Sequence, residues 1–119
     1  MLTLPIKKKW FDMILSGEKK EEYREIKPYY TKRFSKYLPF KINSGFWNCD
    51  NTIVETYIMK NPDNLCFNIC FRNGYSANSP SFIAKISLSI GIGKEEWGAE
   101  KGKQYFILTI HEILKGSEG

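Results

Sequence analysis

Residues 17–24 read Gly17-Glu18-Lys19-Lys20-Glu21-Glu22-Tyr23-Arg24 and join an amphipathic segment to an alternating one. Glycine tolerates the left-handed backbone conformation that is common just past a helix C-terminus, so we expect the preceding helix to end at Gly17. Alternation over residues 21–26 predicts a strand with Glu22 and Arg24 on one face. The stretch therefore predicts a helix, a turn and a strand that gather three ionic side chains, Lys19, Glu22 and Arg24.

Short elements flank this stretch on both sides. Residues 2–4 alternate and lead through Pro5 into a helix whose apolar stripe is Trp10, Phe11, Ile14 and Leu15. On the other side, Pro28 suits the first turn of a second short helix, which Pro39 is expected to stop. Residues 42–64 are rich in Asn and receive no assignment.

The second half of the chain reads as strands. Residues 65–72 and 82–90 alternate between apolar and polar side chains, and the turn residues between them predict a long hairpin. Glycines at positions 91 and 93 are expected to break the second of these strands, and a final strand follows at residues 105–113. Several strands with about two short helices near the N-terminus predict an α+β fold built as a small β-barrel.

The size and hydropathy of the chain limit its class. With 119 residues, of which 42% are hydrophobic, it is expected to form one domain over residues 1–119. No run approaches the ~18 consecutive apolar residues that a membrane span needs. Lys7, Lys8 and Lys9 follow the first apolar residues, the reverse of the order in a secretory signal. We therefore expect a cytoplasmic protein with no membrane partner.

Positive charge is concentrated in the first third of the chain. The formal net charge is +5, and residues 1–41 hold eleven Lys and Arg against five Asp and Glu, whereas the rest holds seven against eight. Such asymmetry favours a polyanionic partner, because neutralising phosphates releases counterions. The alternative is a lysine-rich surface that is only solvated.

The three cysteines, Cys49, Cys66 and Cys70, include no C-x-x-C pair. An odd number without that spacing indicates neither a disulfide framework nor a tetrahedral zinc site. We expect reduced thiols, no metal and no cofactor.

Lys19, Glu22 and Arg24 permit three interpretations. The two cations can orient one carboxylate and still bind an anion, since Arg suits a bidentate contact and Lys a point contact. Alternatively, Glu22 acts as a general base and a desolvated Lys19 as an acid or nucleophile. In the third interpretation, the three side chains form an exposed cluster of ion pairs, each worth less than ~1 kcal/mol.

The pattern G-x-K-x-x-E-x-R resembles the signature of activating signal cointegrator homology (ASCH) domains, small barrels similar to the PUA RNA-binding domain. Further stretches resemble small bacterial and phage-type members, namely residues 71–75, 96–98 and 105–108. The resemblance covers nearly the whole chain. It implies a PUA-like β-barrel whose cleft, lined by the signature residues, binds RNA, a nucleotide or a modified nucleoside.

Members of that family differ in activity, so the resemblance leaves a hydrolase open. Some hydrolyse an acyl group from a modified cytidine with a Lys and Thr pair, and Glu22 stands here at the threonine position, which argues against that amidohydrolase chemistry. Others are described as ribonucleases, for which Lys19, Glu22 and Arg24 are the matching positions. Paired-histidine catalysis is excluded because His111 is the only histidine. A protein-interaction module is the third alternative.

Other side chains are secondary candidates. Arg72 and Lys85 lie on the polar face of the expected hairpin and are candidate ligand-binding residues. Loop aromatics at Trp47 and Trp97 are expected mainly to anchor their loops, with a place beside the cleft as the alternative. Rings interspersed with cations over residues 27–37 are suited either to stacking on bases or to the core; they are Tyr29, Tyr30, Phe34 and Tyr37.

Overall fold

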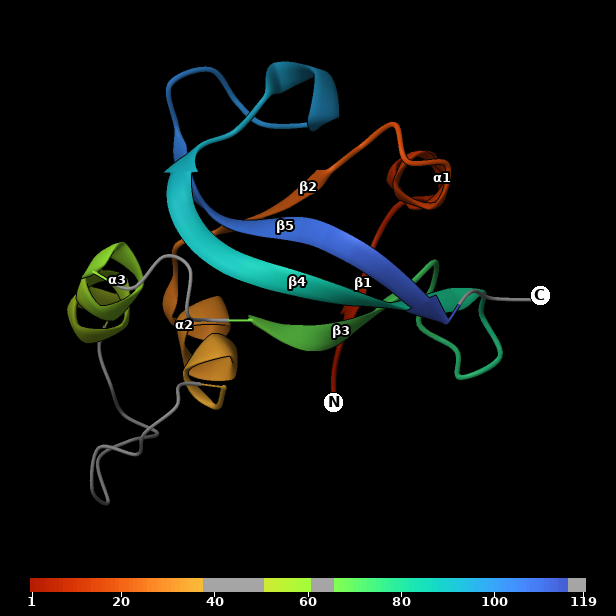
Figure 1. The fold of residues 1–119 in the computed structure, drawn as a ribbon, viewed down its shortest axis with the longest axis horizontal. Helices are drawn as coiled ribbons and strands as arrows, with labels where there is room; N and C mark the ends of the chain where they lie inside the picture. The colour runs from red at the N-terminus through yellow and green to blue at the C-terminus, as the bar shows by residue number, and fades with distance from the viewer. Residues whose placement is uncertain (38–50, 61–65, 116–119) are drawn as a thin grey trace.

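The computed structural model describes residues 1–37, 51–60 and 66–115. It is an α+β fold in which a five-stranded sheet curls into half of a barrel (Figure 1). The strands are β1 (Leu2–Pro5), β2 (Glu21–Glu25), β3 (Cys66–Arg72), β4 (Ser81–Ile92) and β5 (Gln104–Lys115). The described helices are α1 (Lys8–Leu15), α2 (Pro28–Ser35) and α3 (Asn51–Lys60), and a 3₁₀ turn spans Glu95–Trp97.

The strand order in the sheet is β1-β3-β4-β5-β2, which makes β1 and β2 its two edges. β1 pairs with β3 in parallel, and every other neighbouring pair is antiparallel. β3 and β4 form the predicted hairpin, with Phe71 opposite Phe82. The segment that supplies the ionic signature therefore lies at an edge of the sheet and not at its centre.

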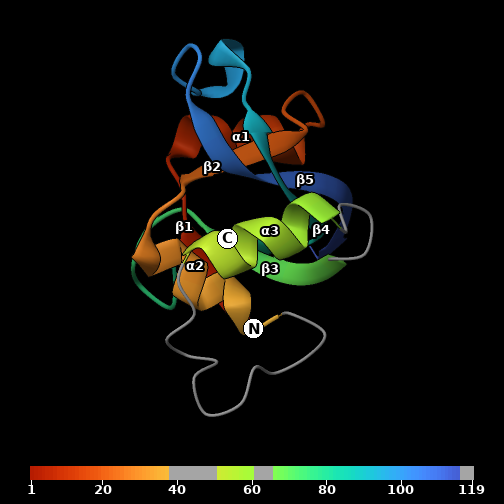
Figure 2. The same cartoon turned by 90° about the vertical axis from the view of Figure 1, so that its left-hand side faces the viewer.

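One face of the sheet, here called the core face, carries the hydrophobic core. Strict alternation in β4 buries Phe82, Ala84, Ile86 and Leu88 on this face. Two helices pack on it through aromatic pairs, because the Phe11 ring of α1 lies 5.0 Å from the Phe82 ring and the Phe34 ring of α2 lies 5.1 Å from the Phe106 ring. α3 lies beside α2 (Figure 2) and adds Ile58 to the same cluster.

The α+β class, the two short helices near the N-terminus and the helix end at Gly17 are confirmed; Gly17 has a φ of 85°. β4 differs from its expectation, because it continues through Gly91 to Ile92 before ending ahead of Gly93. Leu15 is also not a core residue, since it is 39% exposed. α3 falls within residues 42–64, which had no assignment.

Some expectations fall outside the described residues, namely those for Pro39, Trp47, Cys49 and Leu65. Over the residues that are described, none of the helices is both long and apolar enough to cross a bilayer.

Candidate ligand-binding cleft

Lys19 is the most deeply buried ionic side chain in the described part of the chain, with 1% of its surface exposed. It follows the helix-ending Gly17 and points under the 3₁₀ turn, where its Nζ donates to the backbone carbonyl of Trp97 at 2.6 Å. The same Nζ lies 4.7 Å from the Trp10 ring centroid and 5.1 Å from the Tyr23 ring centroid. Burial lowers the pKa of Lys19, and the nearby Glu22 carboxylate offsets part of that decrease.

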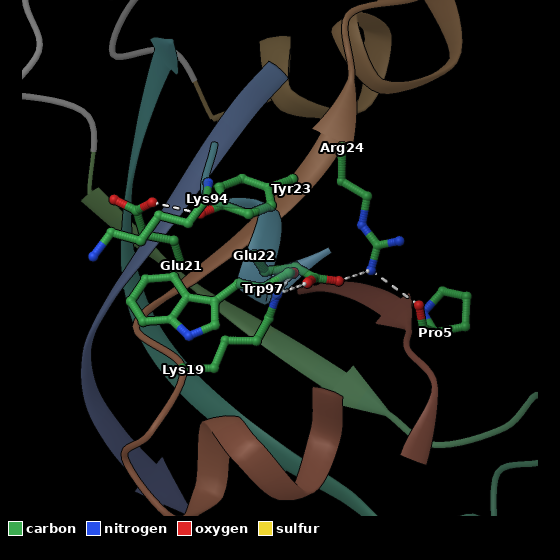
Figure 3. Close-up of polar contacts among 8 residues, drawn as sticks. All are labelled: Pro5, Lys19, Glu21, Glu22, Tyr23, Arg24, Lys94 and Trp97. Carbon is green, nitrogen blue, oxygen red and sulfur yellow. Dashed lines mark hydrogen bonds and ion pairs between the residues drawn. The ribbon is translucent and has the colours of Figure 1, made fainter. Parts of the chain in front are cut away.

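Glu22 lies between the two cations (Figure 3). Its Oε1 is 3.1 Å from Lys19 Nζ and its Oε2 is 2.9 Å from Arg24 Nη2. The cross-strand partners of Glu22 and Arg24 in β5 are Leu108 and Phe106, so both ionic side chains stand on the core face. A buried carboxylate in this position is compensated by its two ion pairs.

Arg24 extends from Glu22 to the opposite edge of the sheet. Its Nη2 also donates to the Pro5 carbonyl of β1 at 3.0 Å, and its Cζ lies 5.8 Å from the Tyr30 ring centroid. Its Nε is buried and has no hydrogen-bond partner among the described residues. One guanidinium nitrogen thus joins β2 to β1, while the buried Nε–H is left without a partner among the described residues.

A cleft of about 570 Å³ opens beside this network. Glu22 and Arg24 line it together with the exposed Lys7. Its aromatic lining comes from five different segments of the described chain; these rings are Trp10, Tyr23, Tyr30, Tyr75 and Trp97. The cleft therefore combines flat apolar walls with one carboxylate and two cations, which suits a planar, partly charged molecule.

The loop that supplies Trp97 is held in place by Tyr23. The Tyr23 hydroxyl donates to Glu21 Oε1 at 2.7 Å and accepts from the Lys94 N–H at 2.9 Å (Figure 3). Burial raises the pKa of Tyr23, so this hydroxyl stays protonated at neutral pH. The contacts are tight, because a Cβ on Gly93 would lie 2.8 Å from the Tyr23 ring. The position of the Trp97 side of the cleft therefore depends on Tyr23 of β2.

The structure brings together Lys19, Glu22 and Arg24, although only the last two line the cleft. Lys19 lies beneath them, where its Nζ contacts Glu22 and the Trp97 carbonyl. Arg72 and Lys85 are not among the described residues that line the cleft. Both stand on the outer face of the sheet, since they alternate with the buried Phe71 and with residues of the core face of β4.

The sequence pattern assigns Trp10 to the apolar stripe of the first helix and does not reveal its place at the cleft. The stripe's buried members are Phe11 and Ile14, whereas Trp10 is half-buried and lines the cleft. Trp97, expected mainly to anchor its loop, both lines the cleft and supplies the carbonyl that binds Lys19. Helical spacing could have separated Trp10 from Phe11, because adjacent residues face different directions.

Remaining polar candidates lie elsewhere. His111 is exposed on β5, with its Nε2 2.7 Å from Ser87 Oγ. Cys66 is exposed and Cys70 is half-buried, and both are free thiols. Across residues 1–37, 51–60 and 66–115, no cluster of three or more His, Cys, Asp or Glu side chains has the arrangement of a metal site.

Chemically, the arrangement is better suited to binding than to proton transfer by Lys19. Reacting groups must lie within hydrogen-bond reach of the substrate, and Lys19 is screened from the cleft by its own partners. Glu22 does reach the cleft and can accept hydrogen bonds there. Comparison with protein-family models, with curated proteins and with solved structures finds no match for this chain.

Proposed function

We propose that the chain is a PUA-like domain of the ASCH type that binds RNA or a nucleotide-derived ligand in the cleft beside Glu22 and Arg24. The observation that carries the proposal is the juxtaposition of five aromatic rings with this ion pair in one cleft of about 570 Å³. Aromatic side chains stack on nucleobases, and a buried carboxylate accepts hydrogen bonds from base amino and imino groups.

In this proposal Glu22 orients the base and the cations meet anionic groups. Arg24 and Lys7 both line the cleft, and a guanidinium and an ammonium are the usual partners of phosphate. Lys19 acts indirectly, because it fixes the Glu22 carboxylate at 3.1 Å and is not itself exposed. Specificity then arises from Glu22, since a ligand that cannot donate to it desolvates the cleft side of this carboxylate and gives it no hydrogen bond in exchange for water.

Thermal unfolding with a panel of nucleoside monophosphates tests the proposal. A ligand that binds only the folded chain raises the melting temperature. Glu22→Gln preserves the shape of the side chain and should abolish the shift for the bound nucleotide. The matched control is Glu96→Gln, because Glu96 is exposed in the neighbouring 3₁₀ turn and does not line the cleft. No shift with any nucleoside, nucleotide or short RNA would contradict the proposal and favour a protein-interaction module.

A hydrolase is the second candidate, and the lowered pKa of Lys19 in contact with Glu22 is the observation that favours it. Proton transfer would use Glu22 as base after a rearrangement that opens Lys19 to the cleft. Incubation with RNA and with acylated cytidine distinguishes the two candidates. Turnover by the wild type that Glu22→Gln removes, with nucleotide affinity retained, identifies an enzyme. Intact substrates together with measurable binding identify a binding module.

A further inference from the structure

A second groove, separate from the cleft, lies between β1 and the C-terminal end of α2. It has a volume of about 690 Å³, and residues 1–3 form one side of it. The other side is made by Lys32, Arg33, Lys36 and Tyr37. Among the described residues that line this groove, three are cationic and none is acidic. We propose that it is a second binding site, which takes the phosphodiester backbone of single-stranded nucleic acid.

The cations of this groove belong to one stripe of the α2 surface, here called the α2 stripe. Its members are spaced i, i+3, i+4 and i+7, which places them on one side of a helix; they are Tyr29, Lys32, Arg33 and Lys36. The buried residues of α2 lie on the other side, as Phe34 is fully buried. The stripe is therefore a surface feature that core packing does not explain.

Tyr29 and Arg33 form a stacked pair at the start of the α2 stripe. The Arg33 guanidinium carbon lies 3.5 Å from the Tyr29 ring centroid, and its Nη1 donates to the Tyr29 carbonyl at 2.9 Å. Tyr29 is nevertheless 52% exposed. An exposed ring backed by a guanidinium is a platform on which an unpaired base stacks, while the cation meets phosphate.

The sequence around the α2 stripe strengthens the electrostatic argument. No Asp or Glu occurs between Glu25 and Asp50, although Lys27, Lys32, Arg33 and Lys36 all do. The stripe and the residues next to it in the chain therefore contribute positive charge only. The helix dipole also favours Lys or Arg near the last turn of a helix. One cation is enough for that interaction, so the dipole does not explain a groove lined with three.

The α2 stripe is continuous with the cleft. Tyr30 lines the cleft, and its ring meets that of Tyr29 edge to face with the centroids 4.9 Å apart. A strand whose base occupies the cleft would thus pass over Tyr29 and place following phosphates on the stripe. Only this path relies on the proposed function; binding of a backbone in the second groove does not.

Fluorescence anisotropy with a short labelled single-stranded RNA of mixed sequence, titrated at increasing KCl, tests the inference. Each phosphate neutralised on a single strand adds roughly 0.7 to the slope of log K against log salt. The double variant Lys32→Gln with Lys36→Gln should lower that slope by about 1.4. Its matched control is Lys60→Gln with Lys101→Gln, because both lysines are exposed and line neither cavity. The control should leave the slope unchanged.

A second variant tests the stacking platform without changing charge. Tyr29→Leu should weaken RNA binding at least about fivefold while the salt slope stays near the wild-type value. Far-UV circular dichroism and the melting temperature verify that each variant is folded. Equal losses in the α2 double variant and its control would overturn the inference, as would α2-dependent binding to phosphatidylserine vesicles with no binding to RNA.

The two proposals fail separately. Glu22→Gln should abolish mononucleotide binding in the cleft and leave the salt slope for RNA almost intact. The α2 double variant should show the opposite pattern. If the α2 double variant leaves the salt slope unchanged while Glu22→Gln abolishes nucleotide binding, only the proposal of the second groove is refuted. If the α2 double variant lowers the slope while Glu22→Gln has no effect on nucleotide binding, only the proposal for the cleft is refuted.

Discussion

Arg24 and Pro5 connect the two edges of the sheet, because Arg24 Nη2 of β2 donates to the Pro5 carbonyl of β1 at 3.0 Å (Figure 3). Among the described strands none pairs with β1 on its outer side, so this edge of the sheet is open there. The same nitrogen lies 2.9 Å from Glu22 Oε2. The open side of the half-barrel is therefore bridged by one guanidinium, and the candidate cleft lies at that bridge.

Replacing Arg24 with Met should destabilise the fold by about 1–3 kcal/mol, because it removes the bonds to Pro5 and Glu22 while keeping an apolar stem. Urea unfolding measures the change. Lys103→Met is the control, since the Lys103 side chain is 39% exposed and its ion pairs are long, at 3.8 and 3.9 Å. That control should change stability by less than ~1 kcal/mol. Equal losses of stability in the two variants would show that the Arg24 bridge stabilises the fold no more than an exposed ion pair does.

The buried pair of Lys19 and Glu22 should behave as a coupled unit. Lys19→Met leaves Glu22 without one of its two cations, and Glu22→Gln leaves the Lys19 ammonium buried beside a neutral amide. The losses of stability in the two single variants should therefore add up to more than the loss in the double variant. The difference, which is the coupling free energy, should be about 0.5–3 kcal/mol. A double-mutant cycle from urea unfolding measures it. Additivity would indicate that the two groups do not interact.

Stability should depend on pH through Lys19. Burial lowers the pKa of Lys19 below 10.5, so between the lowered value and 10.5 the unfolded chain binds more of this proton than the folded chain. The contribution of Lys19 to the free energy of unfolding therefore rises with pH across that interval and is lost as the pH falls through it. Relative to Lys19→Met, the wild type should gain stability as the pH approaches 10.5.

That comparison also cancels an opposing contribution. Burial raises the pKa of Tyr23 above 10.0, so its contribution to the free energy of unfolding decreases as the pH rises above 10.0. Because Tyr23 is present in both proteins, this decrease cancels in the comparison. A flat difference between wild type and Lys19→Met across the alkaline range would mean that Lys19 titrates as an exposed lysine does.

Two glycines offer a test of the cleft wall. Gly98 and Gly102 both have positive φ, at 103° and 74°, so alanine is strained at either position. A Cβ on Gly98 would also lie 3.1 Å from the Trp10 ring, whereas a Cβ on Gly102 meets nothing within 4 Å. Gly98→Ala should therefore be more destabilising than Gly102→Ala and should also weaken nucleotide binding. Calorimetric unfolding and nucleotide titration check both effects; equal losses would contradict the assigned role of Trp10.

Local patterns predicted much of the fold. Alternation placed Glu22 and Arg24 on one face of β2 and predicted the hairpin of β3 and β4, because the side-chain period of a strand is a local property. Gly17 marked the end of α1 for an equally local reason, its positive φ. The parallel pairing of β1 with β3 was not predicted, since it joins segments that are far apart in the sequence.

The amino-acid sequence alone determined which ionic groups stand next to one another, because their spacing in a turn and a strand fixes that relation. Only the tertiary structure decided that Lys19 is buried beneath the cleft while Arg24 bridges two strands. Their decisive partners are backbone carbonyls, of Trp97 and Pro5, brought near by folding. Every residue carries such a carbonyl, so no pattern of side chains can reveal which one a distant cation will bind.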